Sequence, residues 1–256
     1  MLDNDILSAV VICKNEEEKI KNCINSLLWC DEIIVIDDYS SDLTLEKIKE
    51  FNSPKIRIYK RKLNGDFASQ RNFALTKTKK DWILFVDADE VVSEPLRNEI
   101  SSIISDRIVK NVAYKIQRVD YVFGKKLKHG ETGNIKFIRL VKSGFGKWHG
   151  RIHEELAVDG NVGSLRNVIF HYPHREISNF LKEINYYTSV RAQELFEESK
   201  RTNLAQIITY PSGKFLLNYF LKKGILDGIP GLISAITMSF HSFLVRGKLW
   251  SLQNKN

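Results

Sequence analysis

A run of five apolar residues, Trp82–Val86 (WILFV), stands directly before an acidic segment and constrains the fold more than any other feature of the chain. An uninterrupted apolar run of this length is typical of a strand that is buried on both faces. Such strands occur in parallel sheets that are covered by helices on each side. The run therefore predicts an α/β protein with a mostly parallel central sheet.

Short runs rich in β-branched residues alternate with helical patterns through the first half of the chain, as expected for strands joined by covering helices. The predicted strands of this half are Ile6–Ile12, Glu32–Asp37, Ile56–Tyr59 and Trp82–Val86. The predicted helices of this half are Ile20–Leu28, Leu43–Phe51, Phe67–Thr76 and Ser93–Ile104. Further along, we expect strands over Val112–Phe123 and Ile135–Val141, and an amphipathic helix over Glu176–Lys200.

With 256 residues, of which 43% are hydrophobic, the chain is long enough for one large domain and an appendage. The composition becomes basic and apolar near residue 200, which predicts a domain over 1–200 and a helical appendage over 201–256. The three cysteines, Cys13, Cys23 and Cys30, are odd in number and lack a CxxC spacing. This pattern argues against a disulfide framework or a zinc site and favours a reducing compartment.

Acidic residues follow three of the predicted strands: Glu16 follows the first, Asp37 and Asp38 the second, and Asp87 and Asp89 the fourth. In an open α/β sheet these positions face one crevice outside the carboxyl ends of the strands. Asp87 and Asp89 are two residues apart, so in an extended segment both side chains would point to one face and could share a divalent ion. Oxygen ligands of this kind suit Mg²⁺ or Mn²⁺.

A purely structural role is the alternative for these acids. Asp87 and Asp89 would then start a loop or cap the next helix, but Ser93, with Pro95 in the first turn, already supplies that cap. A functional role is therefore favoured for this pair. For Asp37 and Asp38 the two roles are evenly balanced, since Asp is common in turns.

Four blocks in this order, VVICKNEEE, DEIIVIDDYSSDLT, DFASQRNFAL and DWILFVDADE, resemble family 2 glycosyltransferases with the GT-A fold. With the later HGRIHEE and GILDGIPGL segments, the chain is most similar to the WaaE/KdtX-type lipopolysaccharide-core β-glucosyltransferase branch. The resemblance implies a metal-dependent inverting hexosyltransferase of cell-envelope polysaccharide or lipopolysaccharide-core synthesis. It also implies a UDP-sugar donor bound by about residues 1–105, and a saccharide or lipid-linked acceptor bound by about 106–200.

The resemblance also assigns roles to individual residues. The implied nucleotide-sugar-binding residues are Cys13, Asn15, Glu16, Asp37, Asp38, Arg71, Asp87 and Ala88. Asp89 would be the main ligand of Mg²⁺ or Mn²⁺, with Asp87 beside it. Arg71 would lie near the base or the diphosphate, where a cation stabilises negative charge, although a solvated helix position is its alternative.

Inverting transfer needs a base that removes the proton of the acceptor hydroxyl. Many family 2 members present this carboxylate in a Glu-Asp or Asp-Asp pair, which the second half of the chain lacks. It has His153-Glu154-Glu155 instead, and the resemblance points to Glu154, with Glu155 as the second candidate. The alternative is a surface turn with two solvated glutamates.

The C-terminal region holds most of the net charge of +8, because residues 200–256 contain eight Lys or Arg and one acid, Asp227. Its stretch from Gly228 to Val245 carries no charged residue, and Lys222, Lys223 and Arg246 flank it. A core helix pair, a membrane span and an interfacial element all fit this pattern. We favour peripheral attachment to an anionic membrane surface, on the cytoplasmic face of the inner membrane, with homo-oligomer contact as a further possibility.

Four rival functions have weaker support. A nucleotidyltransferase would follow its first strand with a glycine-rich basic loop, whereas this chain has CKNEEE there. A noncatalytic nucleotide-sugar scaffold would need no base. The histidines between His129 and His174 are wrongly ordered for an HExxH zinc enzyme. Nucleic-acid binding is disfavoured, since the basic tail lacks regularly interleaved aromatic residues.

Overall fold

The computed structural model of the chain describes residues 6–106, 109–122, 124–133, 135–150, 154–173 and 177–254. The chain divides into two compact units. The first contains the residues up to 118 together with 136–172, and the second contains 119–135 together with 173–256. The second unit is thus made from two separate stretches of chain.

The first unit is built on a mixed sheet. Its strands are β1 (Leu7–Cys13), β2 (Glu32–Asp37), β3 (Ile56–Lys60), β4 (Trp82–Asp87), β5 (Glu90–Val92), β6 (Ala113–Val122), β8 (Lys136–Lys142) and β11 (Val162–His171). They lie in the order β3-β2-β1-β4-β8-β6-β11-β5. The first four strands of the chain are mutually parallel, whereas β8 is antiparallel to β4, β6 to β8, and β5 to β11. A separate hairpin pairs β9 (Gly146–His149) with β10 (Glu155–Val158).

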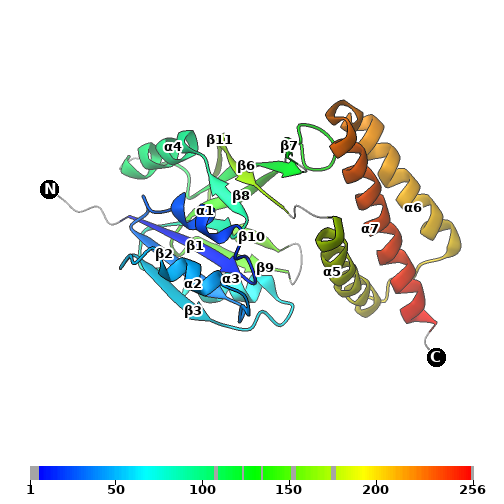
Figure 1. Cartoon of the computed structure of the whole chain (residues 1–256), viewed down its shortest axis with the longest axis horizontal. Helices are drawn as coiled ribbons and strands as arrows, with labels where there is room; N and C mark the ends of the chain where they lie inside the picture. Colours follow the sequence, from blue (N-terminus) through cyan, green and yellow to red (C-terminus); the bar gives the residue numbers. More distant parts are fainter. Residues whose placement is uncertain are drawn as a thin grey trace. The chain divides into compact units, whose positions relative to one another are not determined.

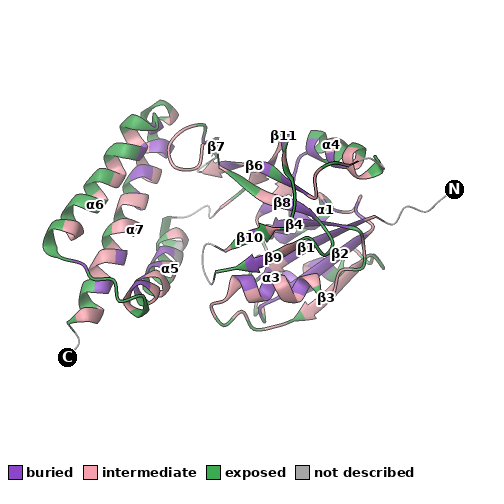
Figure 2. Cartoon of the chain, turned by 180° about the vertical axis from the view of Figure 1, so that it is seen from behind, coloured by how far each residue is buried: buried purple, intermediate pink, exposed green. Residues whose placement is uncertain are grey.

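Helices cover both faces of the parallel part of this sheet (Figure 1). They are α1 (Ile20–Asn25), α2 (Thr44–Lys49), α3 (Phe67–Leu75) and α4 (Glu94–Ser105). Ala9 and Val11 of β1 pack with residues of α1, α2 and α4, while Val10 between them packs with residues of α3. Trp82–Val86 is buried throughout (Figure 2). The prediction of a central strand buried on both faces is therefore confirmed.

The carboxyl ends of three parallel strands lie level with one another. Cys13 at the end of β1 is in register with Asp37 at the end of β2, and Ile12 is in register with Asp87 at the end of β4. As predicted, Ser93 caps α4, because its hydroxyl oxygen accepts a hydrogen bond from the Leu96 amide at 3.3 Å. The acids after β4 are therefore not needed as helix caps.

The second unit is mainly helical. It contains the two-residue strand β7 (Lys125–Lys126), α5 (Ile177–Glu197), α6 (Leu204–Leu216), a π-helical turn (Leu217–Leu221), a 3₁₀ turn (Gly224–Asp227) and α7 (Ile229–Gln253). Ala192 and Leu195 of α5 pack against Val245 and Leu249 of α7. Because of this packing the unit takes in α5, and it begins earlier than the boundary near residue 200 that composition indicates. The division into a transferase domain and an appendage stays a prediction.

Within the described residues, α7 is one helix that is long and apolar enough to cross a membrane by length and composition. Only 28% of its most apolar window is buried inside the protein.

Replacing Phe85 with alanine tests the doubly buried strand. Phe85 is fully buried and meets the Trp148 ring edge-on, with 5.0 Å between ring centroids. We expect Phe85→Ala to lower the free energy of unfolding by about 3–5 kcal/mol, because a large cavity remains. Phe145, which is 39% exposed, provides the matched control, and Phe145→Ala should cost less than about 1 kcal/mol. Urea unfolding measures both values, and equal losses would contradict the assigned burial.

Candidate active site

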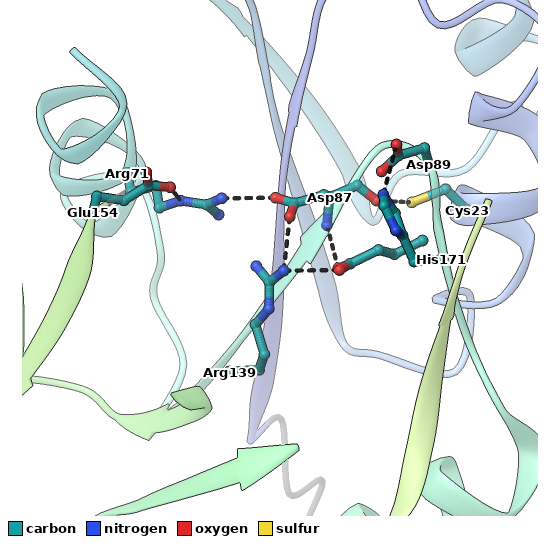
Figure 3. Close-up of polar contacts among 8 residues, drawn as sticks. Cys23, Arg71, Asp87, Asp89, Arg139, Glu154 and His171 are labelled. Carbon is teal, nitrogen blue, oxygen red and sulfur yellow. Dashed lines mark hydrogen bonds and ion pairs between the residues drawn. The ribbon is translucent and has the colours of Figure 1, made fainter. Parts of the chain in front are cut away.

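Two arginines hold the carboxylate of Asp87 at the end of β4 (Figure 3). Nη2 of Arg71 lies 2.7 Å from Oδ1, and Nη2 of Arg139 lies 2.7 Å from Oδ2. The side chains of Arg71 and Arg139 are 6% and 5% exposed, whereas that of Asp87 is 31% exposed. The cations are thus buried, and the carboxylate lies at the edge of the surface.

Helix α3 delivers Arg71 to this position. Asp66 caps the helix by accepting a hydrogen bond from the Ser69 amide at 2.8 Å. The Arg71 guanidinium then packs over the ring of Trp148, 4.8 Å from its centroid. Such contact suits a planar cation that is removed from water. The alternative of a solvated helix residue is therefore wrong for Arg71.

Glu90 completes the charge cluster from β5. Its carboxylate is fully buried and accepts hydrogen bonds from the Asp87 amide at 2.9 Å and from Nη2 of Arg139 at 2.8 Å. Burial raises the pKa of Glu90 despite the charge of Arg139. Burial also acts to raise the pKa of Asp87, but the charges of Arg139 and Arg71 outweigh it and hold that pKa well below its usual range. Asp87 is thus the firmly ionised member of the cluster.

Asp89 has a different partner. Strand β11 pairs with β5, with His171 opposite Glu90, and this places Nε2 of His171 3.1 Å from Oδ2 of Asp89. Burial acts to raise the pKa of Asp89, but His171 lowers it overall. A carboxylate and an imidazole therefore face each other beside the end of β4 (Figure 3).

The sequence analysis assumed an extended backbone from Asp87 to Asp89, with both side chains on one face, and this assumption is wrong. A turn at residues 88 and 89 follows β4, so the two acids do not lie along one extended strand. Asp87 faces the arginines and Asp89 faces His171 (Figure 3). Ala88 between them is buried in the core.

A divalent ion nevertheless suits the donor atoms of Asp89 and His171. In the part of the chain that the structure describes, no three His, Cys, Asp or Glu side chains are grouped as a complete metal cage. A cage is not required, because Mg²⁺ is usually held by one or two carboxylates together with substrate phosphates. His153 and His174 lie outside the described residues, and His149 lies on β9.

The two candidate bases lie in different surroundings. Oε1 of Glu154 accepts a hydrogen bond from Nε of Arg71 at 2.8 Å, and the Glu154 side chain is 13% exposed. Arg71 thereby bridges Glu154 and Asp87 (Figure 3). Glu155 is exposed at the start of β10, opposite His149. The structure brings Glu154 into the charge cluster and gives Glu155 no contact with it among the described residues.

The predicted nucleotide-binding residues at the ends of β1 and β2 form one hydrogen-bonded loop. Asn15 has a φ of 53°, and its Oδ1 accepts a hydrogen bond from the Ser41 amide at 2.8 Å. Asp37 accepts from the Ser40 amide at 3.1 Å, and Asp38 accepts from Lys14 Nζ at 2.7 Å.

Asp37 and Asp38 are both buried, so their carboxylates stabilise the loop through hydrogen bonds inside it. Glu16 lies nearby, with Lys19 Nζ 3.3 Å from its carboxylate.

Cys13 faces the core. Its side chain is 3% exposed, and burial raises the pKa of its thiol. Its backbone carbonyl accepts a hydrogen bond from the Asp38 amide at 2.9 Å, so this carbonyl is also engaged within the protein. Cys13, Cys23 and Cys30 are all buried free thiols.

Sequence reasoning missed Arg139 and the role of His171. Arg139 carried a signal, since it is a single cation within the apolar part of the predicted strand Ile135–Val141, and a buried cation needs a partner. The sequence gives no comparable signal for His171, because β11 was not predicted and its pairing with β5 joins distant segments.

Comparison with known proteins identifies the family. The sequence profile of glycosyl transferase family 2 matches residues 8–155, which is more than half of the chain. The chain therefore belongs to glycosyl transferase family 2, and the expected α/β GT-A fold class is confirmed.

Individual relatives agree with this family. The lipopolysaccharide core biosynthesis glycosyltransferase LpsC of Rhizobium meliloti is 29% identical over 95% of this chain and 92% of its own. A glycosyltransferase of Rickettsia felis is 30% identical over 98% of this chain and 92% of its own. Among solved structures, S. aureus TarS in complex with UDP-GlcNAc matches with a TM-score of 0.47 and 14% identity, over 97% of this chain and 91% of that one.

The depressed pKa of Asp87 predicts how Asp87→Asn alters acid stability. Stability from an acid with a lowered pKa is complete above its ordinary value of about 4 and is lost as the pH falls toward the lowered value. We expect the variant to melt roughly 5–10 °C below the parent at pH 7, because two buried cations lose the carboxylate that they share. The difference should shrink steadily in strongly acidic buffer.

Thermal melting at a series of pH values measures this difference. The exposed Asp159 provides the control, since Asp159→Asn should follow the parent at every pH. A gap for Asp87→Asn that stays constant down to strongly acidic pH would contradict the assignment.

Proposed function

We propose that this family 2 glycosyltransferase moves a hexose from a UDP-sugar to a saccharide or lipid-linked acceptor, with inversion at the anomeric carbon. Similarity to LpsC over nearly the whole chain supports a place in lipopolysaccharide-core or related cell-envelope synthesis. The observation that carries the mechanism is the Arg71 bridge, which joins Glu154 to the acids at the end of β4.

The donor is assigned to the edge of the sheet where β1, β2 and β4 end. The loop of Asn15, Asp37 and Asp38 would form the nucleotide side of this edge, and Glu16 would lie next to it. Its internal hydrogen bonds support a preformed surface, which avoids the cost of ordering a loop on binding. The loop's own carboxylates are engaged inside it, so backbone groups are expected to contribute much of the recognition.

The metal is assigned to Asp89 and His171, with Mg²⁺ or Mn²⁺ as the ion. A bound cation would neutralise negative charge on the departing diphosphate. Asp87 would keep its arginines and act on the donor side without a bond to the ion. The separation of the two acids by a turn supports this division of roles.

Glu154 is assigned as the base. Arg71 occupies Oε1, so we assign Oε2 to the acceptor hydroxyl. The proton moves from the hydroxyl to Glu154, the acceptor oxygen bonds to the anomeric carbon, and the bond from that carbon to the diphosphate breaks with its electron pair on the leaving oxygen.

Arg71 has a second function in this scheme. Among the described residues its buried Nη1 has no hydrogen-bond partner. A buried donor without a partner is costly, which supports a ligand atom at this position when substrate is bound. An anionic group of the donor fits this guanidinium in charge and geometry.

Release of free nucleotide from UDP-, GDP- and CMP-sugars, with Mg²⁺, with Mn²⁺ and without metal, tests the reaction class. Metal-dependent release of UDP supports the proposal. Binding of UDP-sugars without turnover, with or without a panel of saccharide acceptors, would favour a nucleotide-sugar scaffold instead.

Replacing Asp89 and His171 separately tests the metal site. We expect Asp89→Ala to reduce turnover at least about 100-fold, since stabilisation of the leaving diphosphate is worth several kcal/mol. His171→Ala should raise the Mn²⁺ concentration needed for half-maximal UDP binding by about tenfold or more. Calorimetric titration of UDP with and without Mn²⁺ measures binding apart from turnover. Metal-dependent binding that survives in both variants would place the ion elsewhere.

Replacing Glu154 and Glu155 separately tests the base. We expect Glu154→Gln to retain UDP-sugar binding and to lower kcat by at least about 100-fold, because the amide cannot take the proton of the acceptor hydroxyl. Glu155→Gln is the matched control and should stay near the parent, because Glu155 is exposed. The reverse result would transfer the base role to Glu155.

A further inference from the structure

The connection between α6 and α7 exposes a dense group of large apolar side chains. We call residues 217–229 the α6–α7 tip. Its exposed apolar members and their exposed fractions are Leu217 (38%), Phe220 (52%), Leu221 (76%), Ile225 (47%), Leu226 (66%) and Ile229 (74%). Figure 2 shows this end of the two helices largely in the colour of exposed residues. Exposed apolar clusters of this kind mark interaction surfaces.

Hydrogen bonds hold the tip to the other stretch of its own unit, residues 119–135. Asp227 accepts from the amides of Lys128 at 3.1 Å and His129 at 2.8 Å, and its second oxygen lies 2.9 Å from Nδ1 of His129. The Gly130 amide donates to the Lys222 carbonyl at 2.9 Å. The exposed side chains therefore stand on an ordered support.

Glycines make the tip compact. A Cβ on Gly231 would lie 2.1 Å from the carbonyl oxygen of Gly224, and one on Gly224 would lie 2.7 Å from that of Asn218. No side chain fits at either contact. The GILDGIPGL segment of the sequence thus builds a close turn whose aspartate faces inward, whereas Ile225, Leu226 and Ile229 are exposed.

The exposed charges of this region are basic. Lys222 and Lys223 are exposed within the tip, and Lys125, Lys126 and Lys128 are exposed in the stretch that is bonded to it. The nearby acids are engaged within the unit: Asp227 is 6% exposed and accepts hydrogen bonds from the amides of Lys128 and His129, and Glu131 lies 2.6 Å from Lys214 Nζ. An apolar surface surrounded by lysines complements an interface of acyl chains and anionic headgroups.

We propose that the α6–α7 tip inserts into an anionic lipid surface, with its apolar side chains at the acyl boundary and its lysines among the headgroups. A second copy of this chain fits the surface less well, because it would bring the same five lysines against one another. A span by α7 fits less well too, because α7 buries Ala235, Val245 and Leu249 against its own unit.

Vesicle sedimentation of the full chain tests the proposal, using phosphatidylcholine alone and phosphatidylcholine mixed with phosphatidylglycerol. The chain should sediment with the mixed vesicles, and high salt should release it. The double variant Leu221→Ser with Leu226→Ser should lower the partition coefficient about tenfold or more, since two apolar side chains lose their burial. Lys222→Glu with Lys223→Glu should lower binding to the mixed vesicles by a similar factor.

Leu204→Ser is the matched control, because Leu204 is 71% exposed at the opposite end of α6 and should leave binding unchanged. All the variants alter exposed side chains, and circular dichroism checks that they fold. Three results would overturn the proposal: no binding to the mixed vesicles, binding that resists both salt and alkaline washing as a span would, or a dimer in solution that the Leu221/Leu226 variant dissociates. The assay contains no sugar donor, so it stands or fails separately from the transferase proposal.

Discussion

Ion pairs around Asp87 link several helices and strands of the first unit. Two guanidinium groups with almost no exposure lie against Asp87, Glu90 and Glu154, and neither cation is tolerated in the interior without its carboxylate partners. These groups come from α3, β8, β4, β5 and the segment before β10, so the two arginines meet their carboxylates only when all of these elements are in place. The same charged residues therefore stabilise the packing of these elements and form the candidate active site at the sheet edge.

The local sequence pattern was sufficient to predict those helices and strands whose burial or capping depends on neighbouring residues. The apolar run Trp82–Val86 predicted the central strand, and Ser93 predicted the start of α4, because burial and capping depend on neighbouring residues. Pattern was insufficient where geometry depends on a turn. Asp87 and Asp89 are close in sequence, yet a bend separates their side chains, and periodicity arguments that assume an extended backbone fail there.

Long-range pairing accounts for the rest of the candidate site. Arg139 reaches Asp87 because β8 lies beside β4, and His171 reaches Asp89 because β11 lies beside β5. Neither adjacency has a local signature, since antiparallel strands can return to either edge of a sheet after a long connection. The position of Glu154 next to Arg71, 83 residues earlier in the chain, has the same origin.

The discontinuous second unit has a topological consequence. Residues 119–135 begin within β6 and end just before β8, so the chain passes between the units at 118/119, 135/136 and 172/173. A fragment that ends near residue 172 would keep 119–135 but lose Asp227, Lys214 and Asn218, the residues that satisfy its backbone and Glu131. The two units are therefore interleaved parts of one chain, and cutting it at a single point does not separate them into intact modules.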